Sequence, residues 1–358
     1  ETGAATFDAV NKTFTHTWGD AYCSTDLAAY DFMFSTVYET PFVVDETTTV
    51  LPIALTFRPL MARIGMKLAL GANETPKYVT FTTDDNVLPT AGTVNADGTF
   101  SASALTNSLT VETDRKEFTV GLLPVGVASK MSVHVTTTDG MTYSDKSFQL
   151  AGLKRNTHYT MNVPCRTKRF MLTVPDGVNS KYGTGTYGDN GFFQVEPQYD
   201  PESIFDGWHF LRSEIKSDKD AADGDVLKNR NRIQLQAVSL GTNRAQNGAF
   251  VTPPIQCDGT KTVTVSFTAA TNKLTVGSVQ YRIGVTNNGA DISENFLRSF
   301  DNIQSSLEGE CPWKHSGSVS RTHTFTVTNG QRIMMKVYSS GGGTPCHLEL
   351  ADFTYTVE

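Results

Sequence analysis

Residues 131–144, MSVHVTTTDGMTYS, decide the fold class of this chain. Hydrophobic Met131, Val133 and Val135 alternate with polar residues, which is the two-residue period of a strand with one buried face. The Asp139–Gly140 pair that follows is favoured in tight hairpin turns, because these residues tolerate the positive φ angles that such turns need. The stretch therefore predicts two antiparallel strands joined by a turn.

The same signals recur along the rest of the chain. A second hairpin is predicted around Asn329–Gly330, within THTFTVTNGQRIMMKVYS at 322–339. Helical spacing of hydrophobic residues is scarce and occurs in SENFLRSFDNIQSSL at 293–307, behind Ser293 as an N-cap. The sequence therefore predicts an all-β protein with helix confined mainly to 293–307.

Length and charge exclude several classes of protein. The chain has 358 residues, which suits two domains better than one. Its net charge is −7 and it has no block rich in Lys or Arg, so no nucleic-acid partner is expected. No apolar run approaches the roughly 20 residues of a membrane helix. The first residues carry no signal peptide and no lipid-attachment Cys, so contact with a membrane is expected only through a removed or absent lipid anchor.

Composition also indicates where the domains meet. Pro175–Glu202 is rich in Gly, Tyr and Asn and has no sustained period, which predicts a linker over 166–200. The alternative is a pair of short strands packed on one domain. Residues 1–165 and 201–358 are then two β-sandwich domains, and the many strand-like stretches of the second suit a jelly roll.

An ordered set of short motifs in the first domain resembles the fimbrillin-like proteins of Bacteroidetes over about residues 32–164. The motifs end in GLKRNTHYTMNV at 152–163, and the matching positions are Phe57, Arg58, Leu60, Ile64, Leu122, Leu123, Pro124, Gly140, Tyr143, Leu153, Asn156, Tyr159, Met161 and Val163. The resemblance implies a transthyretin-like β-sandwich, with Tyr159 and its neighbours in the core. It also implies a fimbrial protein of the cell surface or outer membrane that joins other fimbrial subunits by strand exchange. Fimbrillins usually carry a complete sandwich before this pattern, so the first fimbrillin domain is expected to be missing or shortened here.

The second domain has a weaker resemblance to carbohydrate-binding jelly rolls of the galactose-binding type. It rests on the strand-like stretches KTVTVSFTA at 261–269 and LELADFTYTV at 348–357, together with a late loop that carries a Trp. In such modules an Asp of the last strand often helps to hold a structural calcium ion, and the matching residue here is Asp352.

An acidic loop adds to the expectation of calcium. SDKDAADGDVL at 217–227 offers oxygen ligands from Asp218, Asp220, Asp223 and Asp225. Its spacing misses the EF-hand pattern by one position, so a solvated acidic loop is the alternative interpretation. The five cysteines form no Cys-x-x-Cys pair and are expected to be free and buried, with one or two disulfide bridges as the alternative. No cofactor is expected apart from a structural calcium ion.

Two tryptophans in loops are candidates for sugar contact. Trp313 and Trp208 could stack on a sugar face, with His315 and Arg282 as hydrogen-bonding partners. The alternative is that each Trp fills the core. The chain has none of the usual hydrolase, metalloprotease or phosphate-loop motifs, so no catalytic residue is assigned.

Three classes of function remain at this point. The favoured one is a non-enzymatic cell-surface or fimbrial adhesin subunit, a tip or accessory pilin that presents a carbohydrate-binding head. The alternative is a surface glycan-binding protein of a polysaccharide-uptake system. An enzyme with an unrecognised carboxylate pair is the third, and nothing in the sequence nominates such a pair.

Overall fold

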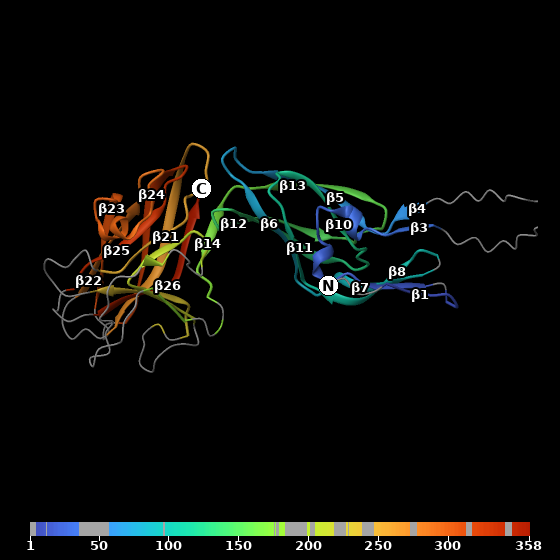
Figure 1. Ribbon diagram of the computed structural model, residues 1–358, viewed down its shortest axis with the longest axis horizontal. Helices are drawn as coiled ribbons and strands as arrows, with labels where there is room; N and C mark the ends of the chain where they lie inside the picture. The colour runs from blue at the N-terminus through green and yellow to red at the C-terminus, as the bar shows by residue number, and fades with distance from the viewer. Residues whose placement is uncertain are drawn as a thin grey trace, which may run out of the picture. The chain divides into compact units, whose positions relative to one another are not determined.

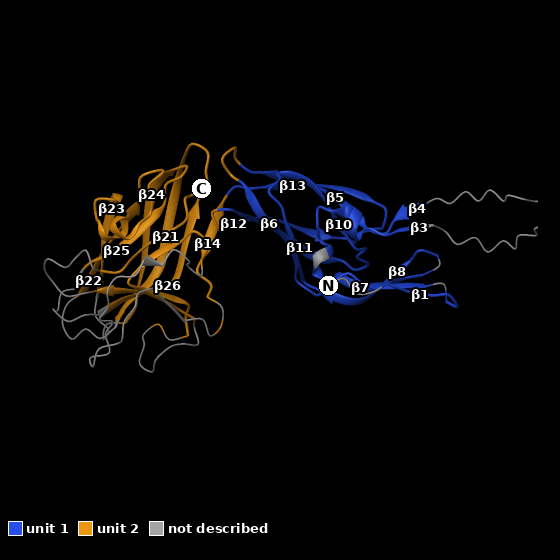
Figure 2. Cartoon of the chain, viewed as in Figure 1, with its two compact units in different colours: residues 1–70, 75–138, 142–166 blue, residues 71–74, 139–141, 167–358 orange. Residues whose placement is uncertain are grey.

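The computed structural model divides the chain into two compact units (Figure 2). The structure describes residues 5–11, 13–35, 57–95, 97–174, 176, 179–182, 199–200, 205–217, 227, 229–237, 247–272, 278–312, 317–340 and 346–358. Unit 1 consists of residues 1–70, 75–138 and 142–166. Unit 2 consists of residues 71–74, 139–141 and 167–358, so two short segments from within the N-terminal half belong to it.

Unit 1 is built from antiparallel sheets and one parallel strand pair (Figure 1). Its strands are β1 (Thr6–Asp8), β2 (Thr13–Thr17), β3 (Met33–Ser35), β4 (Phe57–Pro59), β5 (Ala62–Ala69), β6 (Pro76–Thr83), β7 (Leu88–Val94), β8 (Phe100–Thr106), β9 (Ser108–Glu112), β10 (Glu117–Leu122), β11 (Ser129–Thr137), β12 (Thr142–Leu150) and β13 (His158–Pro164). They pair in the orders β1-β2-β7-β8, β10-β5-β13, β12-β11-β6-β9 and β3-β4. One hydrophobic cluster, which includes Trp18, Leu60, Phe81 and Leu122, lies between these sheets.

The predicted hairpin at 131–144 is confirmed. β11 pairs with β12 in antiparallel register, with Val135 opposite Tyr143. Met131, Val133 and Val135 are fully buried, and Gly140 in the turn has a φ of +77°. The alternation of residue types thus directs one face of β11 into the core of unit 1.

The last strand of the fimbrillin-like motif is β13, which pairs in parallel with β5 so that Tyr159 lies opposite Ile64. Tyr159 was expected in the core, and it packs against the core cluster while remaining half-buried. Its hydroxyl accepts a hydrogen bond from the Lys154 backbone amide at 3.0 Å. The ring therefore closes the turn that precedes its own strand as well as covering the core.

Replacing Tyr159 by alanine should lower the free energy of unfolding of unit 1 by about 1 to 3 kcal/mol, because ring contacts and one hydrogen bond are lost. Denaturant unfolding followed by circular dichroism measures this change. Thr160→Ala on the exposed face of the same strand is the control and should change it by less than about 0.5 kcal/mol. Equal effects of the two substitutions would contradict a role for the ring in packing.

Unit 2 is a sandwich of two sheets (Figure 1). Its strands are β14 (Lys168–Met171), β15 (Asn179–Tyr182), β16 (Tyr199–Asp200), β17 (His209–Leu211), β18 (Ser213–Lys216), β19 (Arg232–Ala237), β20 (Ala249–Val251), β21 (Thr260–Asn272), β22 (Ser278–Val285), β23 (Gln304–Pro312), β24 (Val319–Thr328), β25 (Ile333–Ser340) and β26 (Cys346–Val357). In the first sheet β24 pairs with β21, and β21 pairs with β26. β26 also pairs with β14 and with β19. β19 pairs in turn with β18, and β18 pairs with β15. The second sheet has the order β16-β17-β20-β25-β22-β23.

The chain crosses between these sheets repeatedly. From β19 to β22 and again from β23 to β26, each strand lies in the opposite sheet from the one before it. This wrapping is that of a jelly roll, as the strand-like stretches predicted.

The prediction of a hairpin at Asn329–Gly330 is wrong. β24 pairs with β21 in the first sheet, whereas β25 pairs with β20 and β22 in the second. Gly330 does adopt a positive φ of +84°, so the turn residue was recognised correctly. The turn therefore connects strands of opposite sheets, because β24 and β25 each pair with strands that are more distant in the sequence.

The predicted helix is shorter than expected. Helix α2 spans Glu294–Arg298, and Ser293 caps it by accepting a hydrogen bond from the Phe296 amide. Residues 304–312 form β23, paired with β22, and Leu307 is exposed. Helix α1 (Leu27–Tyr30) and a 3₁₀ turn (Asp20–Tyr22) add little helix. In the described part of the chain, no helix has the length and apolar character that crossing a membrane requires.

The segment expected to be a linker contributes strands to unit 2. β14 pairs with the end of β26, and β15 pairs with β18. Phe170 of β14 stacks on Tyr355 with ring centroids 5.2 Å apart. Residues 168–171 are thus fixed by hydrophobic packing on unit 2. Residues 183–198 of the predicted linker lie outside the described residues.

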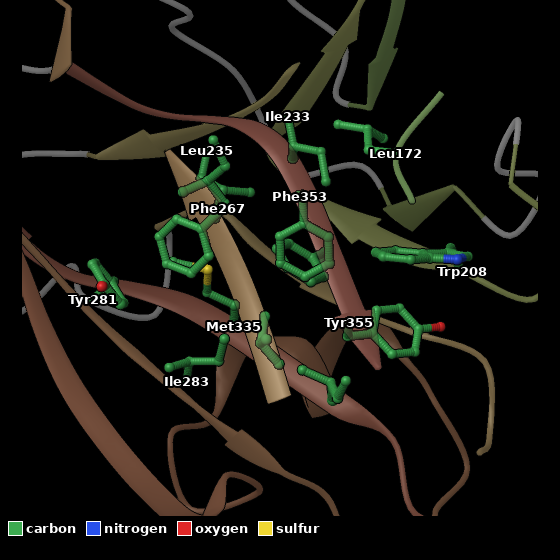
Figure 3. Packing of buried hydrophobic residues seen from close by; sticks show 14 of the residues in the cluster. Leu172, Trp208, Ile233, Leu235, Phe267, Tyr281, Ile283, Met335, Phe353 and Tyr355 are labelled. Carbon is green, nitrogen blue, oxygen red and sulfur yellow. The ribbon is translucent and has the colours of Figure 1, made fainter. Parts of the chain in front are cut away.

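The core of unit 2 is rich in aromatic residues (Figure 3). Phe353 and Tyr355 of β26 lie beside Trp208, with ring centroids 6.0 and 6.3 Å from the indole. Met335 of β25 and Phe267 of β21 come from opposite sheets and belong to the same cluster. The two sheets are therefore held together by a single continuous core.

Candidate functional site

Strand β19 places polar residues on the face of the first sheet that points away from the core of unit 2. Ile233, Leu235 and Ala237 belong to the core cluster, so the alternating residues Arg232, Gln234 and Gln236 lie on the opposite face. Such a face is usually solvated, yet these three side chains are at most 4% exposed. We call this region of β18, β19 and β26 the outer polar face.

Cross-strand neighbours extend the outer polar face on both sides of β19. Gln234 lies opposite Glu214 of β18 and Glu349 of β26. Its side-chain amide donates a hydrogen bond to Glu349 Oε1 at 2.7 Å, and both residues are buried. Gln236 lies opposite His347. Lys216 Nζ lies 3.5 Å from Glu214 Oε2.

A small pocket opens on this face. Its lining is Arg212, Ser213, Glu214, Gln234, Gln236 and His347. The volume open to the centre of a water molecule is about 10 Å³, which is enough for a single water. The pocket therefore admits one polar group of a ligand and is too small for a whole sugar ring.

The chemistry of the lining suits a hydroxyl group. A side-chain amide of Gln both donates and accepts hydrogen bonds, the Glu214 carboxylate accepts them, and the Arg212 guanidinium donates them. A hydroxyl also donates and accepts, so it can satisfy such a mixed set of groups.

The structure removes Trp208 from the candidate ligand-binding residues. Trp208 is 2% exposed and lies among Phe170, Phe210 and Phe250 in the core. It precedes β17, and the alternative that this Trp fills the core is confirmed. An indole enclosed by other rings has no free face for a sugar.

Arg282 of β22 is half-buried and away from the outer polar face, since β22 lies in the other sheet. It forms an ion pair with Glu308 at 2.8 Å and lies over the rings of Phe300 and Tyr338, 5.5 Å from each centroid. These contacts give Arg282 a structural role in joining β22 to its neighbours. Trp313 and His315, the other two candidates, lie outside the described residues.

The described residues add no support to the calcium hypothesis. Asp218, Asp220, Asp223 and Asp225 lie outside the described residues. Asp352 is exposed at a bulge of β26, where its φ is +51°, and it forms an ion pair with Arg230. Among the residues that the structure describes, no three His, Cys, Asp or Glu side chains cluster as metal ligands would.

Comparisons with known proteins give the family of the N-terminal part. Residues 4–176 match the family model described as fimbrillin-like. No match is found among the curated proteins.

Parts of the chain are similar to parts of several solved structures, and the chain spans less than two thirds of the two Bacteroides proteins among them. A proposed cell adhesion protein from Bacteroides uniformis is 16% identical over 44% of this chain and 62% of its own, with a TM-score of 0.33. One from Bacteroides ovatus is 20% identical over 45% and 58%, with a TM-score of 0.29. The C-terminal family 6 carbohydrate-binding module of a laminarinase from Zobellia galactanivorans is 11% identical over 36% and 80%, with a TM-score of 0.23.

The match therefore extends over the whole of the motif set in residues 57–163 and over the strands that precede it. The strands that precede the motif set are β1, β2 and β3, and they belong to unit 1. The N-terminal part of this chain, residues 4–176, is fimbrillin-like.

Proposed function

We propose that the protein is a non-enzymatic fimbrial subunit whose unit 1 joins other subunits and whose unit 2 is a head that binds carbohydrate. The observation that carries the proposal is the joining of a fimbrillin-like module to a jelly roll with a separate core. In such a protein the first part anchors the chain in a fimbrium at the cell surface, and the second part is presented to ligands.

Exposed apolar side chains in unit 1 support contact with another subunit. Phe7 of β1, Met33 of β3, Phe57 of β4 and Leu105 of β8 are each 48% exposed or more. These strands lie toward the same end of unit 1, at the right in Figure 1. β1 and β8 are also the two edges of their sheet. An edge with apolar side chains is suited to receive a strand of a second chain.

Leu105→Lys is expected to reduce incorporation of the protein into fimbriae by tenfold or more, because a charge on the edge strand opposes strand addition. The measurement is the amount of tagged protein in the sheared fimbrial fraction of the producing cells, relative to the total. Val127→Lys, at an exposed position of unit 1 outside its strands, is the matched control and should incorporate normally. Normal incorporation of Leu105→Lys would contradict the proposed edge.

The outer polar face supports carbohydrate binding by unit 2. Its pocket takes one hydroxyl-sized group, so the proposed ligand is a larger glycan that inserts a single hydroxyl between Glu214 and Gln236. Sugars present many such groups, and a weak contact is multiplied when many subunits bind one surface.

A glycan array screened with the full chain should yield binding that depends on this face. Gln236→Ala should weaken binding of a positive glycan about tenfold or more, because one buried hydrogen-bonding partner is removed. Gln280→Ala, at an exposed position of β22 in the other sheet, is the matched control. Equal affinities of the two variants would contradict the assigned face, and an array without any positive glycan would contradict the carbohydrate-binding head.

The second candidate function is a surface glycan-binding protein of a polysaccharide-uptake system. The separate core of unit 2 is consistent with this function and with a fimbrial head alike, because neither function needs unit 2 to polymerise. The two differ in the behaviour of unit 1. Glycan binding by a wild-type protein that never enters the fimbrial fraction would support this second function.

A further inference from the structure

Unit 2 contains a buried lysine between two buried carboxylates. Lys168 Nζ lies 2.6 Å from Asp139 Oδ2 and 3.0 Å from Glu74 Oε1. The Lys168 and Asp139 side chains are each 1% exposed, and that of Glu74 is 7% exposed. We call these three residues the buried triad.

Backbone contacts hold each member of the triad in place. Asp139 Oδ2 also accepts a hydrogen bond from the Gln256 amide at 3.0 Å, and Asp139 Oδ1 accepts one from the Met141 amide at 3.2 Å. Lys168 Nζ donates a further hydrogen bond to the Gln256 carbonyl. Glu74 Oε2 accepts one from the Gly71 amide at 2.9 Å. The amine and the carboxylates are thus fixed in contact rather than brought together by chance collisions.

The segments that carry the carboxylates are themselves fixed in unit 2. The Ala72 and Asn73 amides donate to the Asp258 carboxylate at 2.6 and 3.0 Å. Met141 is fully buried in the core cluster of this unit. The Lys168 amine and the Asp139 carboxylate therefore stay in contact as long as unit 2 is folded.

We propose that Lys168 and Asp139 form an intramolecular isopeptide bond, with Glu74 as the proton carrier. A proton first passes from Nζ to the Asp139 carboxylate along their hydrogen bond, which gives a neutral amine and a carboxylic acid. Nζ then attacks Cγ of Asp139, and the new N–C bond forms. The Glu74 carboxylate takes one proton from the nitrogen and delivers it to the departing hydroxyl, which leaves as water.

The balance of this step requires no other reactant. An ammonium and a carboxylate become one amide and one water, no atom is oxidised or reduced, and Glu74 ends as it began. The water-excluded site favours the step for two reasons. Burial of an ion pair has a desolvation cost that a neutral amide does not have, so the amide is favoured over the ion pair. Exclusion of water also disfavours hydrolysis of the amide.

The intact mass of the denatured and reduced full chain tests the proposal directly. The expected mass is that of the sequence less one water. Fragmentation of a proteolytic digest should give a branched peptide that joins Lys168 to Asp139, and proteases that cut after Lys should leave Lys168 uncut. A mass equal to that of the sequence, or a branch from Lys168 to Glu74, would overturn the assignment.

The Asp139–Gly140 pair supplies the competing explanation of a lost water, because Asp-Gly sequences can also cyclise within the backbone. Lys168→Arg keeps the positive charge but removes the amine nucleophile, so it should restore the full mass. Retention of the water loss in Lys168→Arg would overturn the proposal. Should that variant fail to fold, the branched peptide of the wild-type chain still decides between the two products.

Glu74→Gln tests the role of the proton carrier, since glutamine has nearly the same shape and cannot accept that proton. The expected result is a chain of full mass that converts slowly or not at all, with the circular dichroism spectrum of the wild type. Rapid and complete loss of water in this variant would remove Glu74 from the mechanism. The cross-linked wild-type chain should also migrate faster than Lys168→Arg in a denaturing gel, because the bond closes the loop between residues 139 and 168.

Discussion

Replacing Trp208 by alanine is expected to destabilise unit 2 by about 3 to 5 kcal/mol, the usual cost of removing a large aromatic side chain from a core. The indole is 2% exposed, and its ring centroid lies 4.9 Å from Phe170 and 5.4 Å from Phe250. Those rings come from β14 and β20, which belong to opposite sheets. A cavity at this position therefore weakens the contact between the two sheets, and the loss is a large fraction of the roughly 5 to 15 kcal/mol that keeps a domain folded.

The measurement for Trp208→Ala is hydrogen exchange in β26 as denaturant is raised, because this strand reports on unit 2 alone. Trp208→Phe should lose less than half as much stability, since phenylalanine keeps part of the ring contacts. Met171→Ala, at a side chain that is 58% exposed, should have almost no effect. An unchanged exchange midpoint in Trp208→Ala would mean that the indole is not part of the core, and the sugar-stacking hypothesis for this residue would return.

The elements that were predicted correctly from sequence are those in which local pattern and tertiary partner agree. In β11 the alternation of Met131, Val133 and Val135 and the adjacent Asp139–Gly140 turn both lead to pairing with the next strand. The Asn329–Gly330 turn has the same local signal, but its flanking strands pair with β21 and with β20 and β22. Nothing in the local sequence distinguishes a hairpin from a crossing between sheets, because that choice is made by long-range pairing.

The candidate site was missed for a related reason. The stretch RIQLQA of β19 has the alternation of an ordinary strand whose polar residues face water. The burial of Gln234 and Gln236 depends on their neighbours in the folded chain, and the sequence of β19 does not specify those neighbours. The buried triad is more remote still, since Glu74, Asp139 and Lys168 come from three separate segments. Trp208 was predicted as a candidate for sugar contact, and the ordinary preference of a large aromatic side chain for burial favours the core position that the structure shows.

A second large effect is expected at Lys336 of β25. This lysine is fully buried, its Nζ donates a hydrogen bond to the Asn247 carbonyl at 3.0 Å, and it lies 5.2 Å from the centroid of Phe300. Burial, together with the nearby charges of Arg298 and Arg212, lowers the pKa of Lys336 from 10.5 to about 7. Replacing it by methionine should therefore stabilise unit 2 at neutral and lower pH, because the cost of burying a charge disappears.

The pH dependence follows from the sign of the shift. Between pH 7 and about 10.5 the unfolded chain holds a proton on Lys336 that the folded chain has lost, so the stability of the wild type rises with pH over this interval. Below pH 7 both states are protonated and the full penalty applies. At about 1.4 kcal/mol for each pKa unit, the drop from 10.5 to about 7 corresponds to a penalty of about 4 to 5 kcal/mol.

Unfolding of wild type and Lys336→Met should thus be compared at pH 6 and pH 10. At pH 6 the variant should be more stable by about 2 to 4 kcal/mol, since the relieved penalty exceeds the roughly 1 kcal/mol lost with the hydrogen bond to Asn247. By pH 10 the difference should have nearly vanished or reversed. Taking the difference between the two proteins removes the contribution of other groups that titrate in this range. Lys130→Met at an exposed position of β11 is the control and should show no such trend. A difference at Lys336 that stays constant with pH would mean that this lysine titrates alike in the folded and unfolded chains, and the stabilisation would then have to come from packing alone.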